Sequence, residues 1–518
     1  MEPQGRHLIG AEPSREGAAS FRSCDPTTGQ PFGPEYAEAT PAEIDRALSL
    51  ARAAGRDLAD AGRARRAAFL ERLAGELESL GDPLLELCSA ETALPRGRLV
   101  GERARTVAQA RLFAELAREG SWLEARRDPE MPDREPLPRP ELRRVQVPLG
   151  PVAVFAASNF PLAFSVAGAD TVAALAAGCP AVVKAHPLHP QTSELVGRAV
   201  ARALAECGLP AGAFSLLHGA TPEVGAALVR HPLTRAVAFT GSLAGGRALF
   251  DLAAARPEPI PVYAEMGSVN PLFLLPGALA ARAGEIAAGL HASLTLGVGQ
   301  FCTNPGLVVL ERGGSGDFVR ALAELVEETP AGTMLSAGIR AGYGAGVERL
   351  QDDPAVELRA AGRPAGDGPC EARAHLFTTR GAAFLERAHL ADEVFGPSTL
   401  AVLCEDRAEL LAVAEALPGQ LSAGLHAEPD ELEGARELAR ILAEKAGRVL
   451  FGGFPTGVEV CPAMHHGGPY PATTDPRSTS VGTASIRRFT RPVCYQGFPP
   501  ELLPDDLRDP LPERSGLL

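Results

Sequence analysis

The chain has 518 residues, a hydrophobic content of 45% and a net charge of −14, which suggests roughly three folded lobes and argues against binding to the phosphate backbone of a nucleic acid. No apolar run approaches the roughly 20 residues that cross a bilayer, and residues 1–23 lack the apolar core of a signal peptide. Nine widely spaced cysteines without a C-x-x-C pair exclude a structural zinc site and favour reduced thiols. We expect a cytoplasmic protein with no nucleic-acid partner, no membrane partner and no metal.

The predicted elements begin with helices. Apolar residues recur at helical spacing from Pro41 to Trp122. A proline- and charge-rich stretch over 126–144 indicates a linker or arm. Residues 144–155 predict a strand hairpin that turns at Leu149-Gly150. Short strands rich in Val, Ala and Phe then alternate with helices over 152–275, which predicts a parallel, doubly wound sheet.

A second alternation of strands and helices runs from Ala278 to about Gly482, and a strand-like tail follows over 483–495. The predicted fold class is therefore α/β, with a Rossmann-like cofactor domain, a second α/β catalytic domain and a small β arm. We assign 1–125 and 149–266 to the dinucleotide-binding domain and 267–480 to the catalytic domain. The bridging or oligomerisation arm takes 126–148 and 481–500, and 501–518 is a tail.

Two residue types are unusually scarce. The only lysines are Lys184 and Lys445, and the only asparagines are Asn159, Asn270 and Asn304. A chain rich in Ala, Arg, Gly and Pro has replaced these residue types wherever a substitute worked. The remaining positions are therefore enriched for sites where Arg, Asp or Ser would fail.

Cys302 stands in the segment Gln300-Phe-Cys-Thr-Asn304, directly after a glycine-rich turn at Gly297 and Gly299. Backbone N–H groups and a nearby base could activate a thiol there. The plainer interpretation is a small buried hydrophobic residue, which most free cysteines are. The flanking Gly, Gln and Asn favour Cys302 over the other cysteines as a nucleophile.

Three polar side chains lie at or just past predicted strand ends, where ligands of such sheets bind. Asn159 offers an amide that could stabilise an oxyanion, Lys184 could bind a ribose or phosphate, and Glu265 could act as a general base for water. The structural alternatives are a turn asparagine, a surface lysine and a solvated strand end. The scarcity of asparagine and lysine weighs against the first two.

Two further segments are weak signals when taken alone. Phe239-Thr-Gly-Ser242-Leu-Ala-Gly-Gly246 joins a strand to a helix start, where backbone N–H groups can hold a pyrophosphate. Glu393-Val-Phe-Gly-Pro397 places a carboxylate before a tight turn, where it could accept two ribose hydroxyls. Both segments are also ordinary turns.

In this order and at these separations, the motifs resemble the aldehyde dehydrogenase superfamily over nearly the whole chain. The matching motifs are Asn159-Phe-Pro, Val183-Lys184, Phe239-Thr-Gly-Ser242, Glu265-Met-Gly, Gln300-Phe-Cys302 and Glu393-Val-Phe-Gly-Pro397.

The resemblance implies a role for each matching residue. Cys302 would attack the aldehyde and carry a thioester, Asn159 would hold the oxyanion, and Glu265 would activate the hydrolytic water. Cofactor binding would fall to the residues of the remaining motifs, namely Lys184, Gly241, Ser242, Gly246, Glu393 and Phe395. The implied cofactor is NADP or NAD.

Departures from the family pattern point to a branch and a cofactor. Pro187 replaces the glutamate that follows the lysine in many NAD-preferring members, so a 2′-phosphate is not repelled and NADP is favoured. This departure and the segment 457–475 resemble a branch with α-ketoglutaric semialdehyde (2,5-dioxopentanoate) and bacterial long-chain fatty aldehyde dehydrogenases. We favour oxidation of dioxopentanoate to 2-oxoglutarate, with Arg477 as a candidate for binding the substrate carboxylate, although an arginine in a polar turn is more often structural.

Two rival functions are a cysteine amidase with a Cys302–Glu265–Lys184 triad and a non-catalytic dinucleotide-binding scaffold. The first predicts amide hydrolysis without a dinucleotide, and the second predicts that Cys302→Ser changes nothing measurable. The strand-like tail and the arm could pair with another subunit, so the resemblance implies a homodimer or homotetramer.

Overall fold

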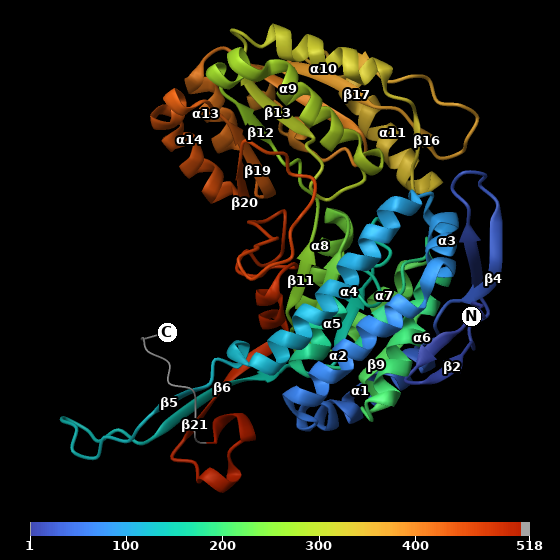
Figure 1. Ribbon diagram of the computed structural model, residues 1–518, viewed down its shortest axis with the longest axis vertical. Coiled ribbons are helices and arrows are strands. Elements are labelled where there is room, and N and C mark those ends of the chain that lie inside the picture. Colours follow the sequence, from blue (N-terminus) through green and yellow to red (C-terminus); the bar gives the residue numbers. More distant parts are fainter. Residues whose placement is uncertain (1, 509–518) are drawn as a thin grey trace.

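The computed structural model describes residues 2–508, so residues 509–518 of the predicted tail lie outside the described residues. Two seven-stranded sheets form two lobes, and a three-stranded arm extends from one of them (Figure 1). Both lobes combine a largely parallel sheet with helices, which confirms the predicted α/β class. Within 2–508, no helix is both long enough and apolar enough to cross a bilayer.

The first lobe begins with short strands and a group of long helices. The amphipathic face of the first helix buries Ile44, Leu48 and Leu58, and Thr40 caps its N-terminus. Strands and helices here are β1(His7–Ile9), β2(Glu12–Ser14), β3(Ser20–Cys24), β4(Pro31–Ala37), α1(Pro41–Asp60), α2(Gly62–Ser79), α3(Gly81–Thr92) and α4(Arg96–Glu119).

The first sheet has the order β11-β10-β7-β8-β9-β1-β2, and its five strands from β11 to β9 are parallel. These strands are buried on both sides, as expected where helices cover a parallel sheet. The strands are β7(Val152–Phe155), β8(Ala181–Lys184), β9(Phe214–Leu217), β10(Ala236–Thr240) and β11(Val262–Glu265). The connecting helices are α5(Ala169–Ala177), α6(Pro190–Glu206), α7(Pro222–Arg230) and α8(Leu243–Ala254).

The second sheet has the order β15-β17-β18-β13-β12-β19-β20, with only β15 antiparallel to its neighbour. Its strands are β12(Leu272–Leu274), β13(Leu307–Glu311), β15(Glu357–Ala361), β17(His375–Arg380), β18(Ser398–Cys404), β19(Gln420–His426) and β20(Ala446–Phe451). Its helices are α9(Pro276–Thr295), α10(Gly316–Glu328), α11(Ala337–Asp352), α12(Gly381–Glu386), α13(Arg407–Ala416) and α14(Leu432–Lys445), and β14(Gly332–Thr333) pairs with β16(Glu371–Ala372).

The arm corrects two sequence predictions. It consists of β5(Arg126–Asp128), β6(Leu142–Pro148) and β21(Thr490–Gln496), in the order β21-β6-β5. The predicted hairpin across Leu149-Gly150 is wrong, because β6 pairs with β21 and β5 while β7 enters the first sheet. The tail is a strand only from Thr490, since Thr483–Phe489 forms 3-10 turns. A short run of alternating apolar and polar residues does not determine which other strand it pairs with.

Candidate functional site

Cys302 follows a turn whose backbone is held in an unusual conformation. The short helix Leu296–Gly299 ends α9, and Gly297, Val298 and Gly299 all have φ between 57° and 66°. A β-branched residue rarely adopts this left-handed conformation, so Val298 is a strained position. A Cβ on Gly299 would lie 2.3 Å from the backbone carbon of Gly396, so no other residue fits there. The chain therefore passes close to the 393–397 turn just before it reaches Cys302.

The asparagines that the sequence singled out surround this turn. Asn270 is fully buried, and its Nδ2 donates hydrogen bonds to the carbonyl oxygens of Cys302 (2.9 Å) and Asn304 (3.0 Å). Nδ2 of Asn304 donates to the carbonyl of Gly396 at 3.0 Å. Nδ2 of Asn159 donates to the carbonyl of Gln300 at 3.0 Å. Each amide binds a backbone carbonyl, which an aspartate could not do.

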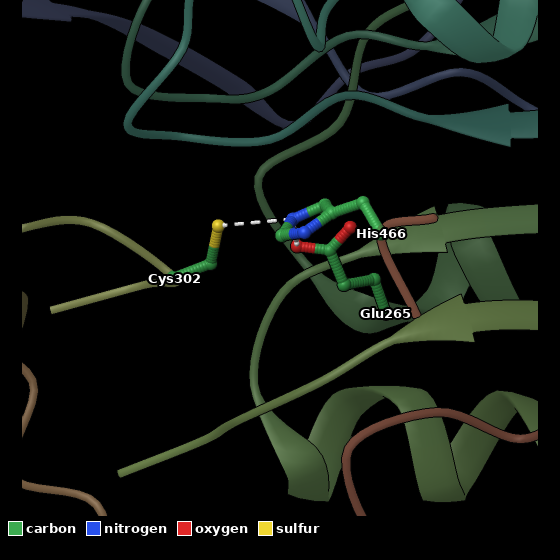
Figure 2. Close-up of side chains that lie close together, drawn as sticks. All are labelled: Glu265, Cys302 and His466. Carbon is green, nitrogen blue, oxygen red and sulfur yellow. Dashed lines mark hydrogen bonds and ion pairs between the residues drawn. The ribbon is translucent and has the colours of Figure 1, made fainter. Parts of the chain in front are cut away.

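The thiol of Cys302 lies beside an imidazole and a carboxylate (Figure 2). Nε2 of His466 is 3.5 Å from Sγ of Cys302 and 3.0 Å from Oε1 of Glu265. His466 and Glu265 are almost fully buried, whereas Cys302 is partly exposed. The imidazole thus contacts both the thiol and the carboxylate, and a substrate could approach the sulfur from the exposed side.

A long loop from the second half of the chain brings His466 to Glu265. Glu265 ends β11, and the backbone N–H of Met266 donates to the carbonyl of Ala472. The same loop returns with Ser480, whose hydroxyl donates a short hydrogen bond to Oε2 of Glu265. Both oxygens of the Glu265 carboxylate are therefore bound by the segment 465–480.

The surroundings move the pKa values of these groups in opposite directions. Loss of water around the thiol raises the pKa of Cys302 well above its usual value, and the charge of Glu265 adds to the rise. Burial also tends to raise the pKa of Glu265, but the charge and hydrogen bond of His466, with the hydrogen bond of Ser480, outweigh it and lower the pKa. At neutral pH the site therefore holds a protonated thiol next to an ionised carboxylate, a base placed to receive its proton.

The predicted cofactor residues of the first lobe lie along the carboxyl edge of its sheet. Lys184 ends β8, and its ammonium donates to the carbonyls of Gly219 (2.7 Å) and Ala185 (3.4 Å). Burial lowers the pKa of Lys184 to about 8, and the charge of Glu38 opposes this effect.

The start of α8 fits a phosphate-bearing cofactor. The Ser242 hydroxyl caps α8 by accepting from the N–H of Gly245, and the first residues of the helix are exposed. Exposed N–H groups at a helix start attract anions. Gly241 and Gly246 permit close packing, because a Cβ at these positions would approach the ring of Phe239 and the side chain of Met266 within 2.7 Å.

Glu393 and Phe395 line a cavity in the second lobe, together with Ser268 and Asn304. The Glu393 carboxylate lies against Gly267, where a Cβ would come within 2.5 Å of Oε2. Burial raises the pKa of Glu393 to about 7, and a hydrogen bond from the Ser268 backbone opposes the rise. A carboxyl held in this way can accept hydroxyl hydrogen bonds, as ribose recognition requires.

Arg477 is exposed and is not part of this buried cluster. Its side chain is 88% exposed and forms an ion pair with Asp475 at 3.0 Å. Lys184 is likewise engaged with backbone carbonyls, and the carboxylate of Glu265 is bound by His466 and Ser480. The structure therefore places an imidazole next to the thiol where the amidase alternative required an ammonium.

His466 was not among the predicted site residues. It lies in the segment 457–475, which resembles a branch of the family but carries no catalytic motif, and it stands 164 positions along the chain from Cys302. A usable signal was present, since the chain has only 11 histidines and two of them, His465 and His466, are adjacent.

The same three side chains could also hold a metal ion. One ligand atom each from Glu265, Cys302 and His466 lie within 4.8 Å of one another. A thiolate, an imidazole and a carboxylate at this separation suit tetrahedral Zn²⁺. The sequence predicted no metal, because these residues come from three distant segments and form no recognisable spacing.

The fold and the site together define a class of protein: two α/β lobes with a cysteine thiol beside a buried imidazole and carboxylate. The model of the aldehyde dehydrogenase family matches residues 13–353. The chain belongs to this family, and it is an NAD(P)-dependent aldehyde dehydrogenase.

Two relatives match nearly the full length. Alpha-ketoglutaric semialdehyde dehydrogenase 2 of Azospirillum brasilense is 52% identical and covers 99% of this chain and 98% of its own. Alpha-ketoglutaric semialdehyde dehydrogenase of Acinetobacter baylyi is 46% identical, over 98% of this chain and 96% of its own.

Solved structures share the fold. Gamma-glutamyl-gamma-aminobutyraldehyde dehydrogenase of Burkholderia cenocepacia has a TM-score of 0.82 at 21% identity, covering 96% of this chain and 97% of its own. An aldehyde dehydrogenase of Bacillus cereus has a TM-score of 0.80 at 23% identity, and the match covers 95% of this chain and 96% of that one.

Proposed function

We propose that this enzyme oxidises 2,5-dioxopentanoate to 2-oxoglutarate, with Cys302 as the nucleophile and NADP as the favoured cofactor. The observation that carries the proposal is the thiol of Cys302 beside the buried His466–Glu265 pair. The substrate is supported by the two full-length relatives, both of which bear the name alpha-ketoglutaric semialdehyde dehydrogenase. These relatives favour the dioxopentanoate substrate over a long-chain fatty aldehyde.

The site residues can perform the two half-reactions in turn. Glu265 accepts the thiol proton, the sulfur of Cys302 attacks the aldehyde carbon, and an amide hydrogen of Asn159 stabilises the resulting oxyanion. The bound cofactor supplies a hydride acceptor. The proton that Glu265 accepted passes to solvent, so the carboxylate is ionised again when it takes a proton from the water that attacks the thioester on Cys302. The Cys302 thiolate then leaves and recovers the proton held by Glu265 as the free thiol, while the product loses its remaining water proton to solvent and departs as the carboxylate. His466 and Ser480 keep the carboxylate in place for both steps.

Cofactor binding falls to the residues along the edge of the first sheet and to the 393–397 turn. Ser242, Gly241 and Gly246 would hold the pyrophosphate at the start of α8, while Glu393 and Phe395 would bind the nicotinamide half. Lys184 would hold the adenosine ribose. Pro187 stands where a carboxylate would repel a 2′-phosphate, which favours NADP.

The arm supports a further part of the proposal. Among the described residues, β21 is an outer strand of the three-stranded sheet that extends from the lobe, and an outer strand can pair with another subunit. We propose a homodimer or homotetramer built through this arm, and a cytoplasmic location in keeping with nine free cysteines.

The test is a spectrophotometric panel of dioxopentanoate, succinic semialdehyde and decanal against NAD and NADP. We expect dioxopentanoate with NADP to give the highest kcat/KM, and Cys302→Ala to abolish aldehyde-dependent formation of reduced cofactor. Cys461→Ala, a partly exposed cysteine in the loop before His466, is the matched control. Turnover that survives in Cys302→Ala would refute the nucleophile, and a preference for decanal would refute the substrate.

A further inference from the structure

An arginine of α4 lines an open groove between this helix and residues 458–460. The groove is lined by Arg105, Ala108, Gln109 and Leu112 of α4 and, on the opposite side, by residues 458–460. Nε and Nη2 of Arg105 are buried without a hydrogen-bond partner, and so is Oε1 of Gln109. Arg105 forms no ion pair within the described part of the chain, where its guanidinium only stacks on the ring of Phe164 at 5.5 Å.

Buried guanidinium N–H groups without acceptors are costly, so a bound water, ion or ligand is expected to complete them. Two nearby carboxylates do not serve this purpose. Oε1 of Glu102 accepts from the backbone N–H groups of Leu162 and Ala163, while its Oε2 is buried without a hydrogen-bond partner. Oε1 of Glu459 accepts from the N–H of Val460. Neither carboxylate comes within ion-pair distance of Arg105.

A row of aromatic rings leads from Arg105 towards Cys302. The guanidinium stacks on Phe164, the ring of Phe164 packs on Phe160 at 5.3 Å, and Phe160 packs on Phe301, the residue before Cys302, at 5.3 Å. Burial and the charge of Glu265 raise the pKa of Cys302, and the positive charge of Arg105 opposes this rise. Arg448 also interacts electrostatically with Cys302, but its Nη1 and Nη2 already donate to the carbonyls of Gly457 and Pro455. Arg448 has only Nε without a partner and Arg98 only Nη1, whereas Arg105 has two unpartnered donors, Nε and Nη2.

We propose that Arg105 binds the terminal carboxylate of an anionic semialdehyde in the groove between α4 and residues 458–460, while the aldehyde end reaches Cys302. The inference rests on the proposed function and names the residue that selects its substrate. A guanidinium can grip a carboxylate through two parallel hydrogen bonds. This role fits Arg105 better than Arg477, whose side chain is exposed and already paired with Asp475.

The test compares two aldehydes of the same chain length, anionic dioxopentanoate and neutral pentanal, in Arg105→Met. Methionine keeps an apolar stem and removes the charge. We expect kcat/KM for dioxopentanoate to fall roughly 10- to 100-fold, chiefly through KM, because a charge-assisted hydrogen bond is lost. The value for pentanal should fall far less, and product inhibition by 2-oxoglutarate should weaken in parallel. Arg105→Lys should restore part of the preference, since it keeps the charge without the planar fork.

Arg111→Met is the matched control, because Arg111 lies on the same helix and pairs with Glu78 at the surface. This substitution should leave kcat/KM for both substrates unchanged. Equal losses for dioxopentanoate and pentanal in Arg105→Met would overturn the proposal, since they would mean that Arg105 acts on the thiol and not on the carboxylate. Full activity in Arg105→Met, with an unchanged ratio of kcat/KM for dioxopentanoate to kcat/KM for pentanal, would overturn it as well. A wild-type enzyme that oxidises neither aldehyde would instead refute the proposed function.

Discussion

At the scale of single residues, the proposed chemistry depends on a protonated thiol, that of Cys302, next to an ionised carboxylate, that of Glu265. Removal of water and the charge of Glu265 raise the pKa of Cys302, whereas His466 and Ser480 hold Glu265 ionised. The two groups are therefore poised to exchange a proton when a substrate arrives. Neighbouring titratable groups with pKa values displaced in opposite directions are typical of acid–base sites.

We expect Lys184, as a proposed cofactor ligand, to make the binding of NADP dependent on pH. Its pKa of about 8 means that the ammonium is charged at pH 7 and largely neutral at pH 9. A cation attracts a 2′-phosphate, so we expect the Kd for NADP to rise as the pH increases from 7 to 9, while the Kd for NAD changes less. Fluorescence titration of the enzyme without aldehyde would measure both.

Lys184→Met should weaken NADP binding and remove this part of the pH dependence. Lys445→Met is the control, because Lys445 is a half-buried lysine that donates to the carbonyl of Glu415 and belongs to no predicted site. An equal pH dependence in Lys184→Met and in the wild type would show that another group is responsible.

The cluster of Cys302, His466 and Glu265 should make the enzyme sensitive to zinc. We expect Zn²⁺ to displace the thiol proton, bind the three side chains and block the reaction until EDTA removes it. Activity assays would follow inhibition and recovery, and Co²⁺ would report the thiolate bond by its charge-transfer absorption.

His466→Ala should raise the zinc concentration needed for half-inhibition about tenfold or more, since one of three ligands is lost. His465→Ala is the matched control from the adjacent position. If both variants responded to zinc like the wild type, the metal would be binding elsewhere.

At the scale of the elements, the turn before Cys302 sets the position of the nucleophile. Gly299 has φ of 66°, and its Cα lies against the backbone of Gly396 and Pro397. We expect Gly299→Ala to lower the free energy of unfolding by about 1–3 kcal/mol and to reduce kcat, because the turn must move away from the 393–397 segment. Equilibrium unfolding in urea and steady-state kinetics would measure the two effects.

Gly342→Ala provides the contrasting substitution. Gly342 is exposed within α11, and a Cβ there would meet nothing within 4 Å. This change should raise stability by about 0.5–1 kcal/mol, because alanine loses less backbone freedom than glycine in a helix. A Gly299→Ala variant as stable as the wild type would show that the turn tolerates a left-handed alanine.

At the scale of the whole molecule, the arm carries the prediction about assembly. Pro492 lies within β21, and Pro148 of β6 pairs with Thr490, so neither proline interrupts the ladder between the two strands. Since alternate residues of an antiparallel strand point their backbone nitrogens to opposite sides, the N–H of Cys494 points away from β6, on the same side as the nitrogen of Pro492.

Cys494→Pro should therefore prevent another strand from pairing at this edge and shift the protein towards smaller species in sedimentation velocity. Cys494→Ser, which keeps the amide, should leave the assembly unchanged. An identical oligomer in both variants would place the subunit contact on another surface.

Much of the α/β order could be predicted, because alternation of apolar strands and amphipathic helices is a local property of the chain. Residues 152–275 gave the parallel sheet, and the scarce asparagines indicated the segments that surround Cys302. Strand partners could not be predicted in the same way. The supposed hairpin at Leu149-Gly150 failed because β6 and β21 are far apart in sequence and meet only through the folded arm.

The sequence by itself determined the class of chemistry, because the motifs from Asn159 to Glu393 occur in a specific order and every one is short and local. Only the tertiary structure decided the surroundings of the thiol. His466 reaches Cys302 across 164 positions, and Arg105 reaches the same region from α4. Proximity between distant segments depends on how the lobes and loops pack, and no local pattern of residues encodes it.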